Sequence, residues 1–344
     1  MECIETHCPG SAFFLVPRRS QASQIEPPSR VNSRNGFNER AIAKSMPPRD
    51  IPPVPAELLP PYVVSGSETQ IAPFVLCSPH SGRVYPSSFV ELSRLSPLSL
   101  RKSEDCFVDD LFAPVASAGA PLIAARFPRA FLDVNREPYE LDPELFLEPL
   151  PDFANTQSVR VAGGLGTIAR IVADGEEIYR HKLPLASGIA RVEQLYIPFH
   201  AALCDLIETT RSRFGYAILI DCHSMPSASM APAGGPRPDI VLGDRFGASA
   251  DCKITRFLKD ALGALGYEVH MNRPYAGGYI TEHYGRPARD VHAVQIEINR
   301  GLYLDELTLR PTAGFGELRR DLQSLAGSLF IDLPALLERR AAAE

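Results

Sequence analysis

Two histidines each follow a short apolar run that is typical of a buried strand. Phe74-Val75-Leu76-Cys77 leads into Ser78-Pro79-His80-Ser81-Gly82, and Ala217-Ile218-Leu219-Ile220 leads into Asp221-Cys222-His223-Ser224. In α/β proteins, ligands bind in the crevice at the carboxyl ends of such strands. Two imidazoles presented there can converge on one zinc ion. The alternative interpretation is that they are unrelated histidines in two structural turns.

The neighbours of each histidine favour the metal interpretation. Pro79 fixes the dihedral angle at the entry to the first turn, and we expect Gly82 to allow a left-handed exit. Asp221 precedes His223 by two positions, so both side chains point to the same face of an extended strand. Asp221 could therefore bind the metal itself or orient a neighbouring ligand.

A catalytic zinc ion usually has three protein ligands and keeps one position for water. The acidic stretch Ser103-Glu104-Asp105-Cys106-Phe107-Val108-Asp109-Asp110 is the natural source of the third ligand. We expect Asp105 at the start of a helix and Asp109 one turn further along the same face, and we take Asp105 as the ligand, with Asp109 and Asp221 as alternatives. Acidic residues are also favoured at helix N-termini by the helix dipole alone.

The segment Arg129-Ala130-Phe131-Leu132-Asp133-Val134-Asn135-Arg136 carries groups suited to an anionic substrate. An Asn-Arg pair at the end of a strand offers an amide and a guanidinium fork, so Asn135 and Arg136 are matched to a substrate carboxylate. Arg129, at the other end of the strand, could polarise a scissile carbonyl and stabilise the oxyanion. The alternative is a surface salt bridge to Asp133 or Glu137.

Glu297 is a charged residue inside the apolar run from Val294 to Ile298. A lone buried carboxylate is costly, so it needs a partner or a catalytic role. We predict that Glu297 is the general base that takes a proton from zinc-bound water, with a structural ion pair to Arg300 or Arg273 as the alternative. Residues 272–281 are polar and glycine-rich, and we expect them to form a flexible substrate loop with Arg273 as a substrate-binding residue.

Short apolar runs alternate with amphipathic stretches from about residue 70, which predicts an α/β domain with a largely parallel sheet. We expect a long helix over 190–214, kinked by Pro198 and stopped by Gly215, and a long functional loop over 137–165. The expected strands cover residues 75–77, 122–125, 131–134, 217–222, 239–243, 267–271 and 293–298. The catalytic domain is predicted over residues 66–344, behind a disordered or loosely attached segment over 1–65 that is rich in proline.

The overall composition excludes several classes of protein. The 344 residues carry a net charge of −6, which gives no electrostatic case for binding nucleic acid. No run of about 18 apolar residues suggests a membrane span. The seven cysteines include no CxxC pair, so we expect reduced thiols and a cytoplasmic protein. The expected partner is therefore a small molecule, and the sequence carries no signal for the oligomeric state.

Taken together, these motifs resemble the N-formylglutamate amidohydrolase family. The motifs stand in that family's order, and the resemblance covers about residues 70–335. They are Ser78-Pro79-His80-Ser81-Gly82 with Tyr85-Pro86, Phe127-Pro128-Arg129 with Asp133-Val134-Asn135-Arg136, Asp221-Cys222-His223-Ser224, and Ile296-Glu297-Ile298-Asn299-Arg300. The family is similar in fold to zinc carboxypeptidases and aspartoacylase-like deacylases. This implies a phosphorylase/hydrolase-like three-layer α/β/α sandwich with a mixed, mostly parallel sheet.

The resemblance also implies roles for individual residues. His80 and His223 would bind one zinc ion, Asn135 and Arg136 would hold the substrate carboxylate, Arg129 would steady the oxyanion, and Glu297 would shuttle protons. In the carboxypeptidase-like relatives an acidic ligand follows the first histidine by three positions, where this chain has Arg83. The expected reaction is hydrolysis of the formyl amide of N-formyl-L-glutamate or a similar N-acyl amino acid. The alternatives are a deacylase or carboxypeptidase-like hydrolase with another substrate, and an inactive relative that binds a small molecule.

Overall fold

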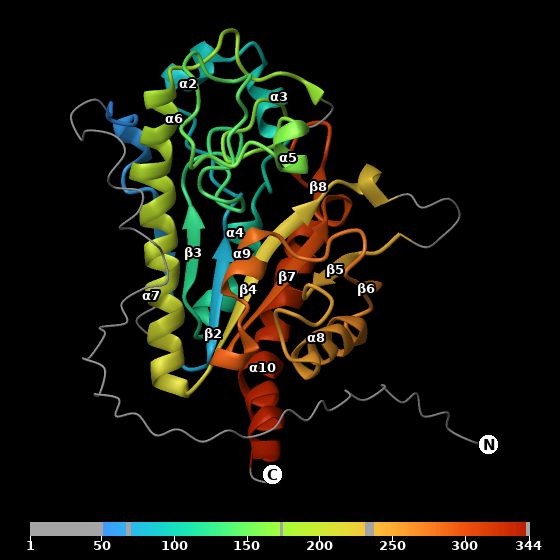
Figure 1. Cartoon of the computed structure of the whole chain (residues 1–344). Helices are drawn as coiled ribbons and strands as arrows, with labels where there is room; N and C mark the ends of the chain where they lie inside the picture. Colours follow the sequence, from blue (N-terminus) through green and yellow to red (C-terminus); the bar gives the residue numbers. More distant parts are fainter. Residues whose placement is uncertain (1–50, 67–69, 173–174, 231–236, 342–344) are drawn as a thin grey trace, which may run out of the picture. The chain divides into compact units, whose positions relative to one another are not determined.

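The apolar runs form the strands of one mixed seven-stranded sheet in the computed structural model (Figure 1). The structure describes residues 51–66, 70–172, 175–230 and 237–341. In the order β1-β3-β2-β4-β7-β5-β6, the four strands from β3 to β7 are mutually parallel, β1 is antiparallel to β3, and β5 is antiparallel to β7. The strand bounds are β1 Tyr62–Ser65, β2 Phe74–Ser78, β3 Leu122–Ala125, β4 Ala217–Met225, β5 Ile240–Gly243, β6 Val269–Met271 and β7 Val291–Asn299, with a separate hairpin of β8 Leu304–Asp305 and β9 Arg310–Pro311.

Helices lie against the sheet on more than one side. The apolar side chains of α4, α8 and α10 share one core with alternate strand residues such as Phe74, Ile220 and Ile296. In contrast, α7 contacts β2 and β4, and α9 contacts β4 and β7, but neither helix contributes to that core. The helix bounds are α2 Ser87–Leu92, α3 Pro97–Arg101, α4 Val108–Ser117, α5 Val159–Ala162, α6 Leu185–Arg191, α7 Ile197–Phe214, α8 Cys252–Ala264, α9 Tyr279–Tyr284 and α10 Gly314–Ala341. The α/β class with a mixed, mostly parallel sheet is therefore confirmed.

The long helix predicted over 190–214 is present, with a local irregularity before its proline. A π-helical turn at Val192–Tyr196 joins α6 to α7, and Pro198 lies in the first turn of α7. Proline lacks the N–H group and its ring clashes with the carbonyl four residues earlier, so a widened turn at this point accommodates it. Gly215 ends α7 with a left-handed φ of 86°, as its position after the periodic residues predicts.

Two expectations about the ordering of the chain need correction. The strand predicted over residues 131–134 is absent, because these residues form turns and irregular backbone. The N–H groups of Phe131 and Leu132 both donate to the carbonyl of Pro128. This run is apolar because it is buried, and the guanidinium of Arg191 lies 3.8 Å from the centre of the Phe131 ring. At the N-terminal end, β1 lies inside the segment expected to be loosely attached, while residues 1–50 lie outside the described part of the chain.

Strand alternation divides the sheet into an apolar face and a polar face at its carboxyl end. Cys222, Val294 and Ile296 belong to the core with α4, α8 and α10. The alternate positions hold Asp221 and His223 on β4 and Gln295 and Glu297 on β7, and His223 pairs in register with Glu297. Neighbouring residues in register point to the same face, so the two strands place four polar side chains together. Among the described helices, none has the length and apolar character needed to cross a membrane.

Candidate functional site

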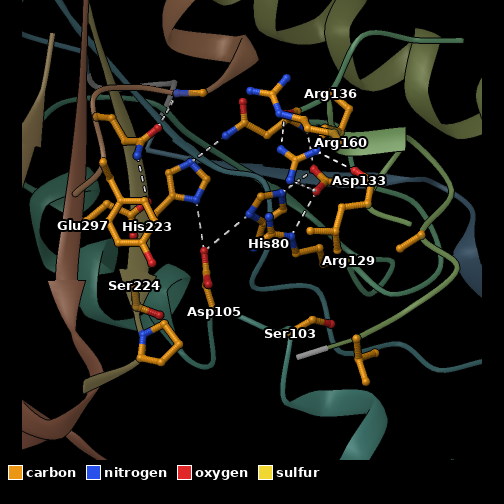
Figure 2. Close-up of a pocket in the computed structure, with 18 of the residues that line it drawn as sticks. His80, Ser103, Asp105, Arg129, Asp133, Arg136, Arg160, His223, Ser224 and Glu297 are labelled. Atoms are coloured by element: carbon orange, nitrogen blue, oxygen red, sulfur yellow. Dashed lines mark hydrogen bonds and ion pairs between the residues drawn. The ribbon is translucent and has the colours of Figure 1, made fainter. Parts of the chain in front are cut away.

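His80, Asp105 and His223 meet in the interior and offer three potential metal-ligand atoms. These atoms lie within 4.8 Å of one another, and all three residues are buried. Oδ2 of Asp105 is 3.5 Å from Nδ1 of His80 and 3.0 Å from Nδ1 of His223 (Figure 2). Within the described residues, Nδ1 of His80 has no hydrogen-bond partner. A buried, unsatisfied imidazole nitrogen beside a carboxylate is the arrangement expected of a cation site.

The loops that carry these candidate ligands are joined by a backbone hydrogen bond. His80 follows β2, and its carbonyl accepts a hydrogen bond from the N–H of Asp105 at 3.0 Å. Gly82 does not have the left-handed conformation expected from the sequence. Glycine is needed there because a Cβ atom would collide with the carbonyl oxygen of Phe127. Asp105 lies just before α4, in a turn where Phe107 has a left-handed φ of 63°.

A second carboxylate contacts the opposite nitrogen of each histidine. Nε2–H of His80 donates to Oδ1 of Asp133 at 2.7 Å, and Nε2 of His223 lies 2.9 Å from Oδ1 of Asp221. At His80 this carboxylate fixes the ring orientation and keeps the proton on Nε2, which leaves Nδ1 available as a ligand. Asp221, left open above as a ligand or an orienting group, thus lies where it orients His223. Asp133 was not identified as a partner of His80, because 53 residues separate them.

Asp105 is also bound to a buried arginine that was assigned no role at the metal site. Nη2 of Arg300 donates to Oδ1 of Asp105 at 2.9 Å, and Nε of Arg300 donates to Ser224 at 3.1 Å. Burial alone would raise the pKa of Asp105, but the close contacts with His223 and His80 and the charge of Arg300 hold it well below its usual value. The carboxylate therefore stays ionised, with Oδ2 directed at the two histidines.

Asp133 joins His80, one of the candidate metal ligands, to two arginines. Its Oδ2 accepts from Nε of Arg129 at 3.0 Å and lies 3.5 Å from Nη2 of Arg136. Burial lowers the pKa of Arg136, and the charges of Arg129 and Arg160 oppose the stabilising effect of Asp133. One carboxylate is thus shared by two guanidinium groups, and the surroundings retain a surplus of positive charge.

The arginine turn, which we define as residues 128–136, is held by a hydrogen bond from His200 of α7. Nε2–H of His200 donates to the carbonyl of Val134 at 2.8 Å, and Nδ1 lies 2.9 Å from the hydroxyl of Tyr284, the last residue of α9. Burial lowers the pKa of His200 to about 3, so the ring is neutral at physiological pH.

Glu297 is held by a neighbouring amide that also contacts the loop over the site. Nε2 of Gln295 donates to Oε1 of Glu297 at 2.7 Å, while Oε1 of Gln295 accepts from the N–H of Gly278 at 2.7 Å. Burial raises the pKa of Glu297 to about 7. A carboxyl group that titrates near neutrality can both accept and donate a proton in one reaction cycle.

These residues line a cavity of about 680 Å³. It is bordered by six cationic side chains, which are Lys102, Arg129, Arg136, Arg160, Arg245 and Arg300, and by the carboxylates of Asp105, Asp133 and Glu297. The excess of positive groups contrasts with the net charge of −6 of the whole chain. The cavity is therefore suited to an anionic small molecule.

Most of the residues singled out from the sequence meet here, but Asp109 and Arg273 do not. Asn135 lines the cavity, yet its Oδ1 accepts from the N–H of Ile280 at 2.7 Å and its Nδ2 lies 3.2 Å from Nε2 of His223. Asp109 pairs with Arg83 at 2.6 Å and is absent from the group of candidate ligands in the described residues. Arg273 is exposed and does not border the cavity, whereas its neighbours from Pro274 to Gly278 do.

Comparison with known proteins gives consistent matches over about two thirds of the chain or more. The model of the N-formylglutamate amidohydrolase family matches residues 72–304. N-formylglutamate deformylase of Pseudomonas putida is 31% identical over 242 residues, which are 68% of this chain and 82% of that protein. The enzyme of the same name from Pseudomonas aeruginosa is 30% identical over 238 residues, 68% of this chain and 83% of its own length.

Solved structures agree with these sequence matches. The crystal structure of N-formylglutamate amidohydrolase from Ralstonia eutropha JMP134 is similar with a TM-score of 0.75 and 34% identity, covering 81% of this chain and 99% of that one. A gene product of Agrobacterium tumefaciens shares the fold with a TM-score of 0.58 and 19% identity, covering 78% of this chain and 94% of its own.

Proposed function

The chain belongs to the N-formylglutamate amidohydrolase family, and from this premise we propose that it is a zinc-dependent amidohydrolase that cleaves N-formyl-L-glutamate into formate and L-glutamate. The observation that carries the proposal is the buried group of His80, Asp105 and His223 at the floor of a cationic cavity. The relatives that bear the deformylase name support the choice of substrate.

The donor set fits one zinc ion. Two imidazole nitrogens and one carboxylate oxygen are ligand types of catalytic zinc sites with an open position. Nδ1 of His80 is buried without a hydrogen-bond partner in the described structure, and Asp133 and Asp221 contact Nε2 of the two rings. When bound by these residues, zinc would polarise the formyl carbonyl and make water acidic enough to react at neutral pH.

Glu297 and Arg129 are the proposed catalytic residues. The Glu297 carboxylate takes the proton of the attacking water and later delivers it to the amide nitrogen, so that L-glutamate leaves as an amine and the formyl group as formate. Arg129, held at Nε by Asp133, borders the cavity and its positive charge stabilises the oxyanion of the tetrahedral intermediate.

The substrate-binding groups follow from the charge distribution. Arg136 donates through Nε to Leu165 and through Nη1 to Asn135, and its Nη2 lies 3.5 Å from Oδ2 of Asp133. We assign the N–H groups beyond these contacts to a substrate carboxylate. We propose that Asn135, which contacts His223, holds this arginine turn beside the metal ligands. Substrate binding by Arg273 has the least support among the predicted roles, because this residue is exposed and does not border the cavity.

The layering is that of the phosphorylase/hydrolase-like α/β/α sandwiches, which the helices packed against the sheet support. The enzyme works in the cytoplasm on a small molecule, and the free cysteines of the described residues support this location.

A substrate comparison tests the proposal. Purified protein is assayed for release of formate, acetate or amino acid from N-formyl-L-glutamate, N-acetyl-L-glutamate and glutamyl peptides, and its metal content is measured. We expect about one zinc ion per chain and preferential hydrolysis of the formyl compound. Protein that carries the metal but hydrolyses the acetyl or peptidyl substrate in preference would refute the assignment to deformylation.

A further inference from the structure

N-formyl-L-glutamate has two carboxylates, and the cavity has cationic groups on both sides of the metal ligands. The inference that follows rests on the proposed function. In the order of the sheet, the turn that carries Arg129 and Arg136 follows β3, on one side of β2 and β4. Arg245 follows β5, on the opposite side of those strands. The side-chain carboxylate of the substrate lies two methylene groups beyond the α-carbon, so in an extended substrate a bidentate pair with one carboxylate leaves the other to a separate cationic group.

The other cations at the cavity are less suited to the second carboxylate. Arg300 donates to Asp105, to Ser224 and to the carbonyl of Lys102. Nη1 of Arg160 lies 3.8 Å from Glu140. The charge of Arg160 lowers the pKa of Arg136, so Arg160 lies on the same side of the cavity as Arg136. Lys102, whose Nζ lies 3.5 Å from Glu176, offers a single ammonium group, which lacks the guanidinium fork that binds a carboxylate in a bidentate manner.

Arg245 is held at the cavity by its own backbone. Its N–H donates to the carbonyl of Ala276 at 2.7 Å, and its φ is 54°, in the left-handed region. The side chain of Asn272 accepts from the N–H groups on both sides of Arg245, at 3.0 and 3.3 Å. The left-handed region is unfavourable for a residue other than glycine, so these hydrogen bonds maintain the corner.

Glycines bring Arg245 against the loop that closes the cavity. A Cβ atom on Gly243 would lie 2.7 Å from the backbone of Ala276 and Gly277, and a Cβ on Gly277 would lie 3.1 Å from Cδ of Arg245. Nη1 of Arg245 donates to the carbonyl of Gly277 at 3.4 Å. Gly278, the next residue, packs directly on the amide of Asn135, which contacts His223. One short loop therefore separates Arg245 from the metal-ligand residues.

The guanidinium of Arg245 can accept an anion from the cavity. Its partner is Glu282, at 2.9 Å, and the Glu282 side chain is 57% exposed. Exposed ion pairs contribute little, so this pair does not prevent binding of a second carboxylate. The contacts with Glu282 and Gly277 leave further N–H groups of the guanidinium for that purpose.

We propose that Arg245 binds the side-chain carboxylate of the substrate and thereby selects acidic N-formyl amino acids over neutral ones of the same shape. The reacting amide then lies between two cationic regions, with the α-carboxylate on the side of Arg136. This contact is the principal source of discrimination between glutamate and glutamine derivatives.

The test compares kcat/KM for N-formyl-L-glutamate and N-formyl-L-glutamine in the zinc-loaded wild type and in Arg245→Met, Arg160→Met and Arg273→Met. We expect Arg245→Met to lose roughly ten- to hundredfold in kcat/KM for the glutamate substrate, mainly through KM. Its value for the glutamine substrate should change less than about threefold, since a neutral amide forms no charge-assisted contact. Arg245→Lys should restore part of the preference. Arg256→Met, an exposed arginine of α8, is the matched control.

The outcomes separate this inference from the proposed function. If the wild type hydrolyses neither substrate, or both with equal kcat/KM, the proposed substrate itself is wrong. If the wild type prefers the glutamate substrate and Arg245→Met keeps that preference, the role of Arg245 is overturned. Loss of the preference in Arg160→Met or Arg273→Met alone would assign the second carboxylate to that residue instead. Equal thermal unfolding midpoints of Arg245→Met and Arg256→Met exclude a folding defect.

Discussion

The buried, neutral imidazole of His200 should make the free energy of unfolding decrease as the pH falls. The ring is buried, and its pKa is about 3 in the folded protein against about 6.5 in an unfolded chain. The unfolded state thus binds more protons between these two values, and stability is lost as the pH falls below about 6.5. At pH 5 the unfolded imidazole is almost fully protonated and the folded one is not. The resulting loss is about 2 kcal/mol relative to pH 7.5.

This loss can be isolated with a variant that does not titrate. His200→Gln retains an amide N–H that can donate to the carbonyl of Val134, and His200→Asn is a shorter second variant. The free energy of unfolding is measured by urea titration at pH 7.5 and pH 5.0 for each protein. We expect the wild type to lose about 2 kcal/mol more than either variant between the two pH values. Contributions from all other groups cancel in this comparison. Equal losses in wild type and variants would refute a neutral, buried His200.

Three further changes test the site directly. Glu297→Gln should lower kcat by roughly 10²- to 10⁴-fold with little change in KM, as measured by formate release, and a variant with near wild-type turnover would exclude Glu297 as the proton carrier. His80→Ala and His223→Ala should each lose both bound zinc and activity, and chelation of the wild type should abolish turnover until zinc is restored; an active, metal-free protein would contradict the ligand assignment. Asp133→Asn should weaken zinc affinity by roughly 10- to 100-fold in a competition assay with a chromophoric chelator, whereas unchanged affinity would show that Asp133 does not orient His80.

Local pattern predicted the elements whose burial follows from their own residues. The apolar runs around Leu76, Leu219 and Ile296 are long enough to mark central strands, and the polar residues at alternate positions mark the face that carries the site. β1 was missed because it is a short edge strand with alternate residues exposed, directly after a proline-rich stretch. Residues 131–134 were mistaken for a strand because an apolar run signals burial without specifying strand pairing.

The candidate site was predicted where a side chain's role follows from its type and position along a strand. His80, His223 and Glu297 are examples, since each interrupts or ends an apolar run. The choice between Asp105 and Asp109 depends on where α4 begins, which residue spacing does not reveal to within one turn. The contacts of Asp133 with His80 and of Arg300 with Asp105 join residues 53 and 195 positions apart. Only the packed fold brings such pairs together.

The amide of Gln295 joins the loop over the cavity to the proposed base. Because its oxygen accepts from Gly278, its nitrogen must face Glu297, and the amide cannot flip while the loop is in place. The hydrogen bond from Gly278 therefore decides which atom of Gln295 the Glu297 carboxylate meets: an N–H donor, which stabilises the ionised carboxylate, and not the amide oxygen, which would repel it.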